Sequence, residues 1–120
     1  MRFGIIAVSL LALTAAATAA SEDEIMSSRY GNTLIIHDLF GTSRVHYNKN
    51  HTFGAASWLG DVSGTWKLEN GKMCLYAEKY PALYRLKYSI PECDPIEVKK
   101  VGDKWKIGSR DYELVSGIQN

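Results

Sequence analysis

The sequence predicts an all-β protein, an antiparallel up-and-down meander of about eight short strands that forms a small barrel or a curled sheet. From residue 30 onward, short β-branched or aromatic runs alternate with tight-turn dipeptides, which is typical of consecutive hairpins. No segment after residue 20 has a convincing helical repeat of apolar residues. Sequential hairpins favour neighbouring strands in sequence order, and this order gives the meander.

The most informative stretch is the predicted hairpin of residues 64–77. Asn70 and Gly71 form the dipeptide that a type I′ turn requires, because both central residues of that turn take positive φ. A two-residue turn here sets Trp66 opposite Leu75. One face of the hairpin is then apolar and the other is mostly polar, so a register slip of one residue would destroy the pattern. The apolar face comprises Trp66, Leu68, Met73, Leu75 and Ala77.

Three strands are expected before this hairpin. Residues 33–38 are a β-branched run, and residues 44–48 alternate so that Val45 and Tyr47 share one side. Residues 52–57 form a third strand that is weakened by glycine. Turn-forming residues separate these runs, so each strand is expected to pair with the next one.

The segment 83–90 fits two patterns. At a period of two residues, apolar and polar side chains alternate along it, and this alternation predicts a strand. At helical spacing, Tyr80, Tyr84 and Tyr88 would share one face instead. The alternation is cleaner and prolines flank a short segment, so a strand is the prediction.

The C-terminal part is predicted to form a second hairpin and a last strand. Residues 96–101 and 104–108 would pair across Gly102 and Asp103, because a glycine-first turn suits type II′ geometry. Residues 112–115 would form the last short strand, which could expose a sheet edge.

Residues 1–20 are predicted to be a secretory signal peptide, with a basic start, an apolar run and a small-residue cleavage region. The mature chain would comprise a flexible N-terminal arm at residues 21–29 and a single β domain at residues 30–120. Removal of Arg2 from the 14 basic residues leaves 13, which equals the 13 acidic residues. We therefore expect a periplasmic or secreted protein with no membrane span after cleavage and no nucleic-acid partner.

Cys74 and Cys93 are the two cysteines of the chain. An oxidising exported compartment favours a structural disulfide between them, and neither cysteine has the spacing of a redox or zinc motif. Residues 91–95 are expected to form a rigid, proline-bounded loop. The disulfide would then hold this loop across the outer, polar face of the hairpin.

Aromatic side chains are the main candidates for a binding site. Trp58, Tyr80, Tyr84 and Tyr88 could line a surface that binds a sugar or a peptide, because aromatic rings combine a flat apolar face with a polar tip. The alternative is that most of these side chains pack in the core of a small β domain.

Metal binding and catalysis have little support in the sequence. His37 and His46 are weak metal candidates, because adjacent strands could bring them together. Glu92 and Asp94 look like solvated charges in a loop. The sequence contains no nucleophile elbow, zinc-protease motif or phosphate-binding loop, so neither catalysis nor a cofactor is predicted.

The sequence contains a set of short motifs together with both cysteines: residues 30–34, 47–48, 51–53, 63–66, 95–96 and 101–103. With these motifs the chain looks like small exported bacterial proteins of unknown function, and less strongly like bacterial metalloprotease inhibitors. The inhibitor resemblance implies an exported eight-stranded barrel with one disulfide, a Gly-x-Trp strand and a functional N-terminal arm.

The predicted function is that of a small exported, non-catalytic binding module of the bacterial envelope or periplasm, which uses a sheet face or a strand edge. One alternative is an exported inhibitor of a hydrolase, a protease or a lysozyme, whose projecting arm or loop enters an active site. A second alternative is a small hydrolytic enzyme, which would need polar groups that converge in a cleft. The sequence names neither the ligand nor the partner.

Overall fold

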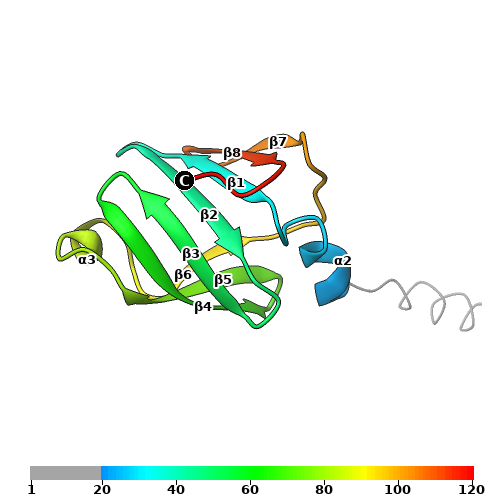
Figure 1. Cartoon of the computed structure of the whole chain (residues 1–120), viewed down its shortest axis with the longest axis horizontal. Helices are drawn as coiled ribbons and strands as arrows, with labels where there is room; N and C mark the ends of the chain where they lie inside the picture. The colour runs from blue at the N-terminus through cyan, green and yellow to red at the C-terminus, as the bar shows by residue number, and fades with distance from the viewer. Residues whose placement is uncertain (1–19) are drawn as a thin grey trace, which may run out of the picture.

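The computed structural model describes residues 20–120, which form eight strands and two short helices (Figure 1). The predicted signal peptide lies outside the described residues except for Ala20, so it stays a prediction. Within residues 20–120, no helix is both long enough and apolar enough to cross a bilayer. In chain order the elements are α2 (Glu22–Met26), β1 (Thr33–His37), β2 (Thr42–Tyr47), β3 (Thr52–Ser57), β4 (Gly60–Glu69), β5 (Lys72–Lys79), α3 (Tyr84–Lys87), β6 (Glu92–Pro95), β7 (Lys104–Ile107) and β8 (Arg110–Val115).

All eight strands belong to one antiparallel sheet with the order β6-β5-β4-β3-β2-β1-β8-β7. Each strand pairs with its neighbours in sequence, except that β6 and β7 do not pair. Pairing of β1 with β8 curls the sheet into a nearly closed up-and-down barrel (Figure 1). The predicted all-β class and barrel form are therefore confirmed. The interval between the edge strands β6 and β7 is called the seam below.

The β4–β5 hairpin has the predicted register. Asn70 and Gly71 have φ values of 50° and 74°, as a type I′ turn requires. Trp66 pairs with Leu75, and the predicted apolar face points into the barrel, where Trp66 and Met73 are buried. Local turn chemistry and side-chain alternation agree here, and together they fix the register without help from the rest of the chain.

The core fills the barrel interior around Trp66. Its indole Nε1 donates a hydrogen bond to the Asn48 carbonyl at 3.0 Å, and its ring stacks on His51 at a centroid distance of 4.1 Å. Tyr47 meets the indole edge-on at 6.4 Å. Buried apolar side chains from six strands surround this centre, and they include Leu34, Val45, Phe53, Val62, Met73 and Tyr112.

The N-terminal segment 21–29 corrects the expectation of a flexible arm. Ser21 and Glu24 form a reciprocal capping box at the start of α2, with bonds of 3.2 and 3.0 Å. Ile25 and Met26 are buried in the core cluster, so this segment is part of the domain. The Ser-x-x-Glu spacing was a usable signal, but two adjacent apolar residues are too few to show a helical period.

Residues 83–90 correct the strand prediction. Tyr84–Lys87 form the short helix α3, so the helical spacing of Tyr80, Tyr84 and Tyr88 is the pattern that applies. The three rings pack in sequence, with centroid distances of 5.5 and 5.0 Å. Burial of Tyr84 favours the helix, because one turn brings its ring onto the barrel while the charged side chains stay in water.

The predicted hairpin across Gly102 and Asp103 is also wrong. Strand β7 pairs with β8 instead, and residues 96–103 form no strand. Trp105 pairs with Tyr112 and their rings stack at 5.6 Å and 5°, a large aromatic contact that the predicted partner segment could not supply.

The cysteines form the predicted disulfide, but its surroundings differ from the prediction. Residues 92–95 are the edge strand β6 and not a loop, and they lie beside β5 with Cys93 directly opposite Cys74. The segment therefore extends the sheet and does not cross its outer face. Cross-strand pairing explains this result, because it satisfies backbone groups that a loop would leave to solvent.

Candidate functional site

The seam borders a cavity of about 200 Å³ inside the barrel. Residues of β6 and β7 line it from the two sides of the seam, and residues of β1 and β5 form the wall behind. Most of this wall is apolar. The apolar lining includes Leu34, Met73, Leu75, Ile96, Trp105 and Ile107.

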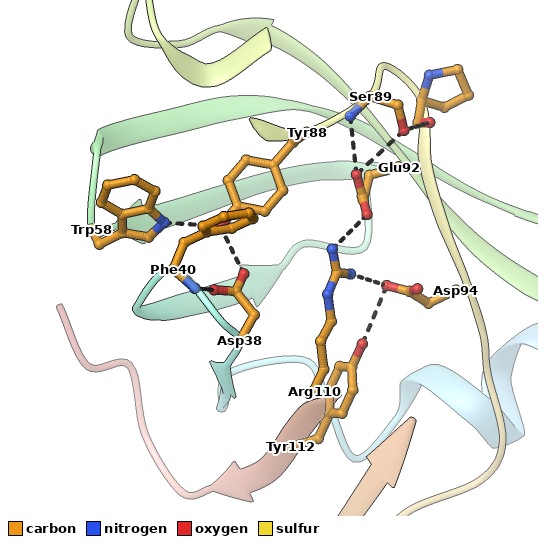
Figure 2. A network of polar contacts seen from close by, with 10 residues as sticks. Asp38, Phe40, Trp58, Tyr88, Ser89, Glu92, Asp94, Arg110 and Tyr112 are labelled. Atoms are coloured by element: carbon orange, nitrogen blue, oxygen red, sulfur yellow. Dashed lines mark hydrogen bonds and ion pairs between the residues drawn. The ribbon is translucent and has the colours of Figure 1, made fainter. Parts of the chain in front are cut away.

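A polar network bridges the seam at the cavity (Figure 2). Arg110, at the start of β8, donates through Nη1 to Asp94 at 2.9 Å and through Nη2 to Glu92 at 2.8 Å. The Tyr112 hydroxyl donates to the same Asp94 carboxylate at 3.3 Å. Burial acts to lower the pKa of Arg110, but hydrogen bonds and the carboxylate charges outweigh it and raise that pKa. The network is therefore a charged strap between β8 and β6.

This network corrects the expectation that Glu92 and Asp94 are solvated charges. Their side chains are only 19% and 31% exposed, because β6 turns both carboxylates toward Arg110. The sequence shows the two acidic residues on either side of Cys93 but does not indicate that Arg110 is their partner. The available signal was their i, i+2 spacing, which sets both side chains on one face of a strand.

Arg29 lines the cavity and is only 2% exposed. Its Nη1 donates to the Ile25 carbonyl at 2.7 Å, and its Nη2 donates to the Glu97 carbonyl at 3.2 Å. Its Nε is buried and has no hydrogen-bond partner among residues 20–120. Burial lowers the pKa of Arg29, and the nearby Tyr47 opposes that shift. No sequence pattern marks this residue, because it stands alone before the first strand.

The four aromatic residues predicted as a binding surface come together. The Trp58 Nε1 donates to the Tyr88 hydroxyl at 2.9 Å, and that hydroxyl donates to Asp38 at 2.7 Å (Figure 2). Tyr84 and Tyr88 also line a second, smaller cavity of about 70 Å³. Tyr84 is only 8% exposed, so its ring belongs to the core cluster. A ligand-binding role for this group stays a prediction.

The structure does not bring the predicted histidine pair together. His37 pairs with Thr42 at one end of the β1–β2 ladder, whereas His46 lies four residues further along β2. The His37 Nδ1 is 2.8 Å from the Thr42 hydroxyl. Among residues 20–120, three possible metal ligands lie close together at Glu69 and the two cysteines. The cysteine sulfurs are poor metal ligands, because they form a disulfide.

The chain matches no protein-family model, and no curated protein or solved structure is significantly similar to it. The resemblance inferred from sequence motifs therefore stays a prediction. Functional proposals for this protein must come from the chemistry of the seam and its cavity.

The buried tyrosine at the seam predicts a stability change at high pH. Burial, followed by the charge of Asp94, raises the pKa of Tyr112 to about 12 from its ordinary value near 10. The neutral hydroxyl is favoured in the folded state, so its contribution is present below about pH 10 and is lost as the pH rises toward 12.

The free energy of unfolding of the wild-type protein should fall between pH 9 and pH 11.5. We expect this fall to be about 2 kcal/mol smaller in Tyr112→Phe. Urea unfolding at both pH values measures this difference. Tyr80→Phe is the matched control, because Tyr80 is partly exposed and its ring packs on Tyr84, outside the network of Asp94 and Arg110. Equal pH dependence in the wild-type protein and Tyr112→Phe would contradict the assignment.

Proposed function

We propose that this protein is an exported, non-catalytic binding module that holds a small apolar ligand in the seam cavity. The observation that carries the proposal is the apolar cavity of about 200 Å³ at the one interruption of strand pairing around the barrel in residues 20–120. Ligand sites are typically concave and mainly apolar, with a few polar groups at fixed positions. The seam cavity has this composition, because Arg29, Glu92 and Asp94 line it among aliphatic and aromatic side chains.

The position of the cavity supports ligand entry through the seam. Elsewhere each strand is hydrogen-bonded to two neighbours, so opening the barrel there would break a ladder. At the seam, β6 and β7 do not pair, and side chains of Arg110, Glu92 and Asp94 make the connection. Side chains can change rotamer without loss of backbone hydrogen bonds, so the seam is the least costly route to the interior.

Cavity size restricts the ligand. Sites for drug-sized ligands usually enclose roughly 300–1,000 Å³, so a cavity below this range suits a ligand with a short apolar body. The Cys74–Cys93 disulfide is compatible with an exported location, because such bonds persist in oxidising compartments.

The hydrolase-inhibitor alternative requires a projecting arm or loop. Helix α2 instead holds Ile25 and Met26 in the core, so an inhibitor would have to use another loop. The small-enzyme alternative is tested by recovering the ligand after it has bound. A binding module returns its ligand chemically unchanged, whereas a hydrolytic enzyme does not.

Titration with 1-hexanol, 1-heptanol and 1-octanol tests the proposal. We expect NMR shift changes at the cavity wall, and affinity that rises roughly fourfold per added methylene while the chain still fits. Ile107→Trp should block binding, because Ile107 lines the cavity. Lys104→Trp adds the same ring to an exposed position of the same strand and should leave binding unchanged. Equal effects of both variants, or no shift changes at the wall, would overturn the proposal.

A further inference from the structure

Arg29 is a buried cation without a matched anion. A guanidinium has five N–H groups, and two of those of Arg29 are bonded to the Ile25 and Glu97 carbonyls. Within residues 20–120 no carboxylate forms an ion pair with Arg29, and its Nε has no acceptor. An unsatisfied donor at a buried position is unfavourable, and a buried charge without a counterion is more so.

The other charged groups at the cavity already have partners. Arg110 binds both Asp94 and Glu92, and Asp94 also accepts from Tyr112. Lys99 contacts Glu97 at 3.6 Å, and Lys106 contacts Asp111 at 3.3 Å. Arg29 is therefore the cavity-lining cation left without an anion in the described part of the chain.

The anchoring bonds make Arg29 a rigid feature of the cavity. One bond reaches back to helix α2, and the other reaches the segment that follows β6. A guanidinium held in this way presents its remaining donors in a fixed direction. The protein would therefore lose little conformational freedom when a ligand binds. Carboxylates fit guanidinium geometry well and form charge-assisted hydrogen bonds.

We infer that the ligand of the seam cavity is a small amphiphilic carboxylate, whose anionic group binds Arg29 and whose apolar chain lies along the wall formed by β1, β5 and β7. This inference rests on the proposed function, because it names the ligand class of the same cavity. The carboxylate supplies the missing acceptor and counterion. The methylene chain covers Leu34, Met73 and Ile107, which neutral apolar ligands would contact equally.

A matched acid and alcohol separate the two proposals. We expect octanoate to bind the wild-type protein at least tenfold more tightly than 1-octanol at neutral pH, as measured by calorimetry. The Arg29 Nε–H resonance should shift on addition of octanoate and stay nearly unchanged with 1-octanol. Because Nε belongs to the same guanidinium as the donors assigned to the carboxylate, this resonance reports on the charged group itself. The measurement requires no variant that has to fold.

Variants at Arg29 then test the charge. Arg29→Met should remove the preference for octanoate and retain 1-octanol binding, whereas Arg29→Lys should retain part of the preference. Equal affinity of octanoate and 1-octanol in the wild-type protein would overturn the carboxylate assignment and leave the cavity proposal standing. Failure of both compounds to bind would overturn the proposed function itself. Retention of the full preference in a folded Arg29→Met protein would show that another group binds the anion.

Discussion

Replacement of Trp66 by alanine is expected to destabilise the protein by about 4 kcal/mol, near the middle of the range for large aromatic side chains removed from a core. The indole is completely buried at the centre of the barrel. Its removal leaves a cavity and removes the ring on which His51 stacks. It also removes one of the two hydrogen bonds to the Asn48 carbonyl, which still accepts from the His51 N–H. Chemical denaturation monitored by far-ultraviolet circular dichroism measures the loss.

Trp58→Ala is the matched control for this prediction. Trp58 is 40% exposed, and its indole bonds to Tyr88 at the surface of the barrel end. We expect a loss of about 1 kcal/mol, because little apolar area returns to water and the hydrogen bond is accessible to solvent. A Trp58→Ala protein less stable than Trp66→Ala would contradict the placement of the core around Trp66.

Arg110→Met is expected to destabilise the protein by about 3 kcal/mol and to loosen the seam. The substitution retains much of the side-chain volume but leaves Glu92 and Asp94 close together without a cation. Removal of one partner from a buried ion pair costs about 3–5 kcal/mol, and the partial exposure of these carboxylates places the effect at the lower end of that range. Faster amide hydrogen exchange in β6 should accompany the loss of stability.

Two controls separate the network from a general effect of lost charge. Lys106→Met removes an exposed ion pair with Asp111 on the neighbouring strand, and it should cost less than about 1 kcal/mol. Addition of Glu92→Gln and Asp94→Asn to Arg110→Met should recover part of the lost stability, because the unpaired charges are then absent. An Arg110→Met protein as stable as Lys106→Met would exclude a structural role for the strap.

We expect stability and ligand binding to depend on different parts of the barrel. Trp66 is buried in the core, Arg110 connects β8 to β6 across the seam, and Arg29, the ligand contact that we propose, lines the cavity. A ligand that enters through the seam must pass the network of Arg110, Glu92 and Asp94. We therefore expect Arg110→Met to increase both the association and dissociation rates of 1-octanol while changing its equilibrium affinity less.

Features that depend on local chemistry could be predicted from the amino-acid sequence. Asn70 and Gly71 favour one turn, and the alternation beside them permits one register, so the β4–β5 hairpin was predictable residue by residue. The all-β class followed from the repetition of such patterns, and the disulfide followed from the cysteine count. Neighbours in sequence supply the information for the hairpin and the class, and the presence of two cysteines in the chain supplies it for the disulfide.

The pairing of β7, the two helices and the candidate site depend on tertiary contacts, because the competing partners lie far apart in the chain. Strand β7 had two possible partners, and the stack of Trp105 on Tyr112 selected β8. Helices α2 and α3 are too short for a reliable period, and burial of Met26 and Tyr84 against distant strands stabilises them. The candidate site has the same origin. Within residues 20–120, Arg29 has no ion-pair partner and lines the cavity of the nearly closed barrel, and no local pattern can state which side chain a barrel encloses.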